Sequence, residues 1–275
     1  MKLGLIIGTP DLRKPLWAIL DGADLDGNLR KAAEWGYDGV ELAIRQPALL
    51  DSAEIKAMLR KYGLELIGLC TGEVFGGDGL GIAGMPQDIA EQAEVRVKAI
   101  VDFASEFGEG VMINIGRVRG KIDPDKPEES REVAVKAFQR LSDFAARKGV
   151  LLALEPVNHY EVNFILTTQD GIAFADDVNR PNFGLMLDTY HMNIEDQNIH
   201  ASLRQARKYL WHVHISDNNR RWPGNAHIDF ASILATLRDL DYSGYLSAEV
   251  FPWPDPETAG RETVRHMRRL LAAIA

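Results

Sequence analysis

Cysteine is almost missing from this sequence, since Cys70 is the only one among 275 residues. One cysteine excludes an internal disulfide framework, so a reducing compartment, the cytoplasm, is expected. The first residues, MKLGLIIGTP, hold only a short apolar run before a glycine and a proline. Such a run is too short for the core of a signal peptide or for a membrane span, and no membrane association is expected.

Clusters of basic residues are also missing. The formal net charge is −9, with 31 Lys and Arg against 40 Asp and Glu. Because Lys and Arg supply most of the affinity for a phosphate backbone, this balance argues against nucleic-acid binding. The apolar content is 46%, which is enough for one large core. We therefore expect a single domain over residues 1–275.

Eight short runs rich in Leu, Ile and Val alternate with segments of helical periodicity. The runs cover residues 3–7, 39–43, 65–70, 111–115, 150–155, 184–188, 211–215 and 245–250. Helical patterns begin near Asp88 and Glu128, and Asp51, Thr168 and Asp229 are expected helix N-caps. Alternating strands and helices favour a right-handed parallel arrangement. The expected fold is α/β, a single-domain (β/α)8 TIM barrel.

Four runs in the second half of the chain each close with an ionisable residue. They are VLLALE, FGLMLD, LWHVH and YLSAE, which end at Glu155, Asp188, His214 and Glu249. Their intervals of 33, 26 and 35 residues match one strand and one helix each, so the four side chains should meet at the carboxyl end of the barrel. Buried charges are costly without a partner, and three carboxylates with one imidazole suit a divalent metal. Taken singly, each carboxylate could instead pair with an arginine, and the histidine could be a core residue.

The donor set also indicates the kind of metal. Carboxylate oxygens with a single imidazole favour Mn²⁺, Mg²⁺ or Co²⁺ over an ion that prefers thiolates. We take Mn²⁺ as the first choice, with Zn²⁺ as a remaining alternative.

Further polar residues follow these strands into the loops. Glu161, His191 and Arg220 are either ordinary loop residues or groups that hydrogen-bond the oxygens of a polyol and stabilise developing charge. The segment 117–127 carries Arg117 and Arg119, which are either solvated or face an anionic substrate group. Arg45 is a third cation that could reach a substrate carboxylate.

The motifs LEPVNHYE, LDTYHMNIED and HVHISDNNRRWPGNAHIDF resemble the sugar isomerase and epimerase superfamily with the xylose-isomerase-like barrel, especially its ketose 3-epimerase branch. MKLGLIIGTPD, VELAIR and CTGEVFGGDGL further resemble 5-keto-L-gluconate epimerase-like and D-tagatose 3-epimerase-like proteins. The resemblance implies Glu155, Asp188, His214 and Glu249 as metal ligands, and Glu161, His191 and Arg220 as substrate contacts. It also favours a homodimer or homotetramer. His159 departs from the pattern, because relatives often carry Arg there.

On this resemblance we expect a metal-dependent epimerase of a ketose or keto-sugar acid. Glu155 and Glu249 would be the acid/base pair, one removing the proton beside the ketone and the other returning one to the opposite face of an enediolate. The nearest alternative is an aldose–ketose isomerase of the hydroxypyruvate or tetronate type on the same metal site. A metal-holding protein that binds a sugar without reaction is another. An apurinic-site endonuclease is disfavoured, because its histidine ligands come from early strands and all seven His here lie at or after His159.

Overall fold

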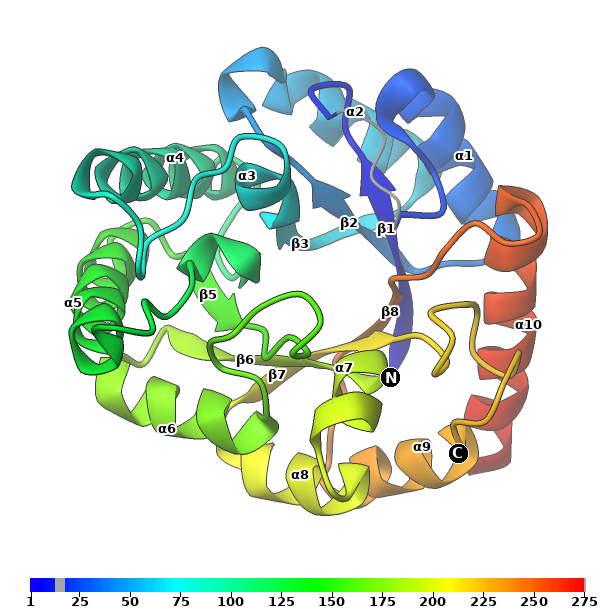
Figure 1. The fold of residues 1–275 in the computed structure, drawn as a ribbon. Helices are drawn as coiled ribbons and strands as arrows, with labels where there is room; N and C mark the ends of the chain where they lie inside the picture. The colour runs from blue at the N-terminus through cyan, green and yellow to red at the C-terminus, as the bar shows by residue number, and fades with distance from the viewer. Residues whose placement is uncertain (13–17, 275) are drawn as a thin grey trace.

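Eight buried, mostly apolar strands pair in sequential order and close into a barrel (Figure 1). We describe residues 1–12 and 18–274 from a computed structural model. The strands are β1 (Lys2–Gly8), β2 (Gly39–Ala43), β3 (Glu65–Cys70), β4 (Met112–Ile115), β5 (Leu151–Leu154), β6 (Phe183–Asp188), β7 (Leu210–Ile215) and β8 (Tyr245–Ala248). Every neighbouring pair is parallel, and β8 closes the ring against β1. The predicted (β/α)8 TIM barrel is confirmed.

Helices surround the barrel and cover its outer face (Figure 1). They are α1 (Leu25–Trp35), α2 (Ser52–Tyr62), α3 (Gly72–Gly76), α4 (Gln87–Ser105), α5 (Pro127–Ala146), α6 (Thr168–Val178), α7 (Thr189–Glu195), α8 (Ile199–Gln205), α9 (Phe230–Asp239) and α10 (Pro256–Ile274). The main core lies between this layer and the strands. There Phe138 of α5 packs against Phe174 of α6 and Phe183 of β6, with ring centroids 5.9 and 5.8 Å apart.

Helix starts follow the capping chemistry of the sequence. Asp51 accepts the backbone N–H groups of the first turn of α2, and Asp229 does the same for α9. The expected cap at Thr168 is wrong by one residue, because Thr167 caps α6 in a reciprocal capping box with Asp170. Thr168 is instead the first helical residue, and its hydroxyl donates to Asp196 at 2.5 Å. Two adjacent threonines offer the same hydroxyl, so the sequence alone does not choose between them.

The candidate ligands lie at one end of the barrel, because all eight strands run parallel. Asp188 is the last residue of β6, and His214 is the last but one of β7. Glu155 and Glu249 each follow their strand by one residue instead of ending it. Their side chains therefore stand at the carboxyl ends of four consecutive strands.

A helix that spans a lipid bilayer needs about 20 mostly apolar residues. Among residues 1–12 and 18–274, no helix combines the length and the apolar character that crossing a membrane requires.

Candidate active site

Four buried side chains from β5 to β8 form the candidate metal centre. Glu155, Asp188, His214 and Glu249 each offer one ligand atom, and these atoms all lie within 4.8 Å of one another. Four donor atoms this close together could hold a single divalent ion. The structure thus brings together the four residues that the strand ends singled out.

One oxygen at this centre suits it to bind a cation. Glu155 Oε1 is buried and has no hydrogen-bond partner among the described residues, whereas its Oε2 accepts from Asn114 Nδ2 at 3.3 Å. An unpaired buried acceptor costs about 1–3 kcal/mol. A divalent ion bound by three carboxylates and one imidazole would satisfy this oxygen and balance the charge.

Local structure holds two of the four side chains in place. Asp188 is the N-cap of α7, and its Oδ1 accepts the backbone N–H of Tyr190 at 2.8 Å. His214 sits in the barrel interior, with Nδ1 3.3 Å from Glu249 Oε2 and 3.8 Å from Glu155 Oε1. These contacts turn one ring nitrogen toward the candidate metal centre.

The two glutamates have opposite electrostatic environments. Burial and the neighbouring carboxylate of Glu249 raise the pKa of Glu155 to about 8. Burial alone would raise the pKa of Glu249 too, but Arg220 and then His214 lower it to about 2. Two carboxyl groups whose pKa values are pushed apart are typical of a general acid and a general base.

Arg220 reaches this centre from the loop after β7. Its guanidinium donates to Asp188 and to Glu249, and these two carboxylates raise its pKa even though burial opposes the charge. The backbone of Arg220 lies in the left-handed region, with φ of 60°, which few residues other than glycine adopt. The loop is fixed by the buried Asp217, whose carboxylate accepts five backbone N–H groups at 2.9 to 3.0 Å, from Asn218, Gly224, Ala226, His227 and Ile228.

His191 lies in the first turn of α7 and is neutral. It is 4% exposed, and burial lowers its pKa to about 3. The side-chain amide of Asn158 lies 2.7 Å from Nδ1 and donates to it, which places the ring proton on Nε2. Nε2 lies 3.8 Å from Glu155 Oε1, so this N–H is close enough to the centre to donate to an oxygen of a molecule bound there.

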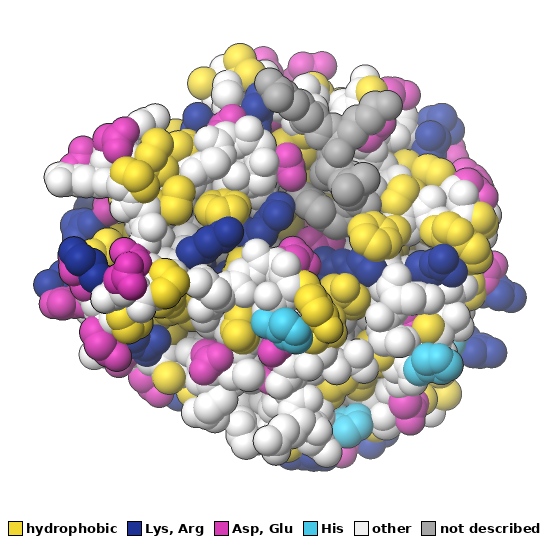
Figure 2. Space-filling view, viewed as in Figure 1, with side chains coloured by type: hydrophobic (Ala, Val, Ile, Leu, Met, Phe, Trp, Pro, Cys, Tyr) yellow, Lys and Arg dark blue, Asp and Glu magenta, His cyan; other side chains and the backbone are white. Residues whose placement is uncertain are grey.

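A cavity beside the candidate metal centre is bordered by every predicted substrate contact. Its lining includes Glu155, Glu249, Glu161, His191, Arg220 and Arg117. Figure 2 shows acidic and basic side chains together around the middle of this face. His159 is half-exposed and lies 2.5 Å from Glu195, the two groups being joined through Nδ1 and Oε1. His159 is the residue that departs from the pattern of the resembling family, and its contact with Glu195 holds the side chain in place.

Arg119 has neither of the roles that the sequence suggested. It is fully buried, and its guanidinium donates to the carbonyls of Gly116, Glu155, Phe164 and Ile165 at 2.7 to 3.1 Å. Burial lowers its pKa to about 10, so it stays charged at neutral pH. Arg119 therefore joins the ends of β4 and β5 to the loop before α6 and does not contact solvent or substrate.

Replacing Arg119 by Met is expected to lower the free energy of unfolding by about 3–5 kcal/mol, because several buried carbonyls lose their donor. Urea denaturation followed by circular dichroism measures this change. Arg207→Met is the control, since that arginine pairs with Asp241 on the surface and its side chain is 60% exposed. The control should unfold at the wild-type midpoint. Equal midpoints for both variants would contradict the role of Arg119.

One buried charged residue was not recognised from the sequence as part of the site. Glu41 lies inside β2 and is fully buried, and His214 Nε2 lies 3.2 Å from each of its oxygens. The signal was present, because a glutamate interrupts the apolar run GVELA. Its partner on β7 lies 173 residues further along the chain.

Comparison with known proteins agrees with this geometry. The model of the xylose isomerase-like TIM barrel family matches residues 29–270. The L-ribulose 3-epimerase of Methylomonas sp. (strain DH-1) is 38% identical over 224 residues, which cover 80% of this chain and 76% of that protein. The 3-dehydro-D-guloside 4-epimerase of Escherichia coli (strain K12) is 28% identical, over 87% of this chain and 92% of that protein.

Solved structures give the same relationship. The D-allulose 3-epimerase from Methylomonas sp. in complex with D-allulose matches with a TM-score of 0.80 and 29% identity, over 98% of each chain. The predicted resemblance to this family and to ketose 3-epimerases is confirmed. This chain belongs to the xylose isomerase-like TIM barrel family.

Proposed function

We propose that this protein is a divalent-metal-dependent epimerase of a ketose or keto-sugar acid, which inverts the carbon beside the ketone. The observation that carries the proposal is the position of the buried carboxylates of Glu155 and Glu249, which meet Asp188 and His214 with all four ligand atoms within 4.8 Å of one another. The names of the relatives support it. A ketose 3-epimerase and a 3-dehydro-sugar 4-epimerase act on different carbons, yet both invert a centre next to a carbonyl.

Glu155, Asp188, His214 and Glu249 would hold the metal, and their oxygen-rich donor set supports Mn²⁺. When bound, a divalent cation polarises the ketone and raises the acidity of the neighbouring C–H. The chain's own groups then move the proton. One glutamate takes it, breaking the C–H bond to give an enediolate, and the other protonates the same carbon from the opposite face.

The remaining residues stabilise the charge that develops on the substrate oxygens. His191 offers a neutral Nε2–H donor, and Arg220 offers a fixed positive charge. Glu161 borders the cavity and accepts from Asn158 Nδ2 at 3.3 Å, which suits it to bind a sugar hydroxyl. No redox step is needed, since the two epimers are stereoisomers of the same composition and every carbon keeps its oxidation state.

The test is proton NMR in D₂O after incubation of the Mn²⁺-loaded protein with a panel of ketoses and ketouronates. We expect the C–H signal beside the ketone to disappear as a new epimer forms. Exchange with aldose formation would establish the isomerase alternative instead. No exchange with any sugar of the panel would contradict the proposal of an enzyme of this class.

The substrate class depends on whether a positively charged side chain binds a substrate carboxylate in the cavity. Of the three cations that the sequence offered, Arg117 borders the cavity, Arg45 donates to Asp78 at 3.1 Å, and Arg119 is buried. Arg117 donates to the carbonyl of Gly72 at 3.3 Å and lies 4.0 Å from Glu73. These contacts orient the guanidinium while leaving further N–H groups for a ligand.

Replacing Arg117 by Ala is expected to lower kcat/KM for ketouronates by about 10- to 100-fold, the loss typical of a charge-assisted hydrogen bond. Neutral ketoses should be affected much less. Steady-state kinetics on matched pairs of neutral and acidic sugars measures the difference. Arg45→Ala is the control and should affect both classes alike. An equal loss for both classes in Arg117→Ala would indicate a structural role and a neutral ketose as substrate.

A further inference from the structure

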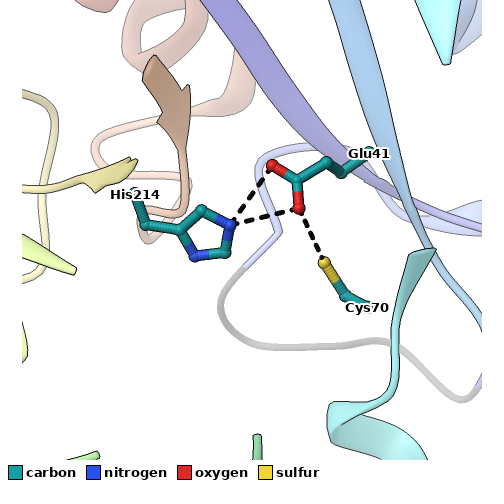
Figure 3. A group of neighbouring side chains, drawn as sticks. All are labelled: Glu41, Cys70 and His214. Atoms are coloured by element: carbon teal, nitrogen blue, oxygen red, sulfur yellow. Dashed lines mark hydrogen bonds and ion pairs between the residues drawn. The ribbon is translucent and has the colours of Figure 1, made fainter. Parts of the chain in front are cut away.

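Glu41 is a buried carboxylate inside the barrel, with hydrogen-bond partners on three side chains. Figure 3 shows two of these partners, His214 and Cys70. Glu41 Oε1 lies 2.7 Å from His212 Nε2, and both oxygens lie 3.2 Å from His214 Nε2. The thiol of Cys70 donates to Oε2 at 3.2 Å. A buried carboxylate is tolerated when it is fully hydrogen-bonded, and this one is.

The contact crosses the interior of the barrel. Glu41 belongs to β2, and both histidines belong to β7, which the sheet order separates from β2 by β1 and β8. His212 and His214 are two residues apart on one strand, so they point to the same inner face. Their rings meet edge to face, with centroids 5.2 Å apart and planes at 86°. Glu41 therefore contacts Nε2 of the His214 ring, whereas Nδ1, on the other side of the ring, faces the candidate metal centre.

The two nitrogens of His214 face different partners. Nδ1 faces Glu249 and Glu155 at 3.3 and 3.8 Å, whereas Nε2 faces Glu41. A neutral imidazole has one N–H and one lone pair, and carboxylates face both nitrogens of His214. A cation held at the candidate metal centre would take the lone pair of Nδ1, and the proton would then stand on Nε2, where Glu41 accepts it.

We propose that Glu41 is a positioning residue that fixes the tautomer and the ring orientation of His214, so that Nδ1 is the metal ligand. This inference rests on the proposed metal site. His212 and Cys70 in turn hold the Glu41 carboxylate, so the orientation of one proposed ligand depends on three side chains outside the proposed ligand set.

Glu41, Cys70 and His214 are also close enough to hold an ion among themselves. The geometry disfavours that use. His214 Nε2 cannot bind an ion and donate its proton to Glu41 at once, and each contact has the length of an ordinary hydrogen bond. The cluster therefore supports the ligand set at the strand ends and is not a second metal site.

The first test measures Mn²⁺ affinity of the metal-free protein by calorimetry, without reference to activity. Glu41→Gln is expected to weaken binding by about 10- to 100-fold, the usual effect of losing the carboxylate behind a histidine ligand. Glu41→Asp keeps the charge but shortens the side chain, so its loss should be smaller. Asp38→Asn is the matched control. Asp38 precedes β2 at the other end of the barrel, where it accepts from Leu3 N and Arg268 at 2.7 Å, and its variant should bind Mn²⁺ as wild type does.

The second test reads the tautomer directly and does not depend on whether a variant folds. The wild-type protein is labelled with ¹⁵N-histidine and loaded with diamagnetic Mg²⁺, and long-range proton–nitrogen correlation locates the ring proton of His214. We expect it on Nε2, with the Nδ1 resonance shifted on metal addition. A proton on Nδ1 would overturn the inference.

The outcomes separate the two proposals. If the wild-type protein binds neither Mn²⁺ nor Mg²⁺, the proposed metal site itself is wrong. If it binds Mn²⁺ and Glu41→Gln binds it equally well, the metal site stands and the positioning role of Glu41 is overturned.

Discussion

Replacing Glu155 or Glu249 by Gln is expected to lower kcat for epimerisation by about 10³-fold, within the range that general acid–base catalysis contributes. Glutamine keeps the size of the side chain and one oxygen that can still bind a metal. It cannot exchange a proton with carbon. The fold should survive, because both residues lie just beyond the strand ends and outside the pairing of β5 and β8.

The two variants should differ in which half of the reaction they lose. If one glutamate serves each face of the substrate, each variant should fail to exchange the C–H proton of one epimer with D₂O. The other epimer would still exchange slowly. Deuterium incorporation into the two epimers, measured separately by NMR, gives this pattern. Glu65→Gln is the control, since Glu65 lies at the amino end of β3 and bonds Lys2 and Tyr245. Turnover close to wild type in either active-site variant would refute the assignment.

Removal of the metal by a chelator is expected to abolish activity, and Mn²⁺ is expected to restore it. Three buried carboxylates at the candidate centre are balanced in part by Arg220, and a divalent cation would neutralise the rest. Because the metal would bind only the folded chain, it should also stabilise it. At a hundred times the dissociation constant the gain is about 2.7 kcal/mol, which for a protein of this size raises Tm by about 5–10 °C.

Differential scanning fluorimetry and an activity assay on the same samples measure both effects. Ca²⁺ provides a comparison, because it prefers a larger shell of oxygen ligands than this site offers. Full activity after exhaustive chelation would rule out a metal-dependent reaction. A rise in Tm without recovered activity would show metal binding alone. It would favour the alternative hypothesis of a metal-holding protein that binds a sugar without reaction.

Local pattern predicted most of this fold. Each of the eight apolar runs overlaps an observed strand, and the two helices expected near Asp88 and Glu128 begin at Gln87 and Pro127. These features depend on residues close in sequence, whose periodicity and capping chemistry act within one element. The same holds for the four candidate ligands, because a parallel barrel places the carboxyl ends of all its strands on one face. Once the strands were assigned, the proximity of Glu155 and Glu249 could be predicted, because both lie at carboxyl ends of strands.

The tertiary structure alone decided how those residues are supported. For Arg119 the sequence left two alternatives open, a solvated side chain or one that faces an anionic substrate group. The structure shows a third, burial against four carbonyls, because an arginine in a polar segment looks the same in sequence in all three cases. The proton position on His191 depends on Asn158, 33 residues away, and the orientation of His214 depends on Glu41, 173 residues away. The sequence thus determined the barrel and the grouping of the candidate ligands through short-range pattern. Packing across the barrel decided the charge and tautomer of each group, because burial and long-range hydrogen bonds have no local signature.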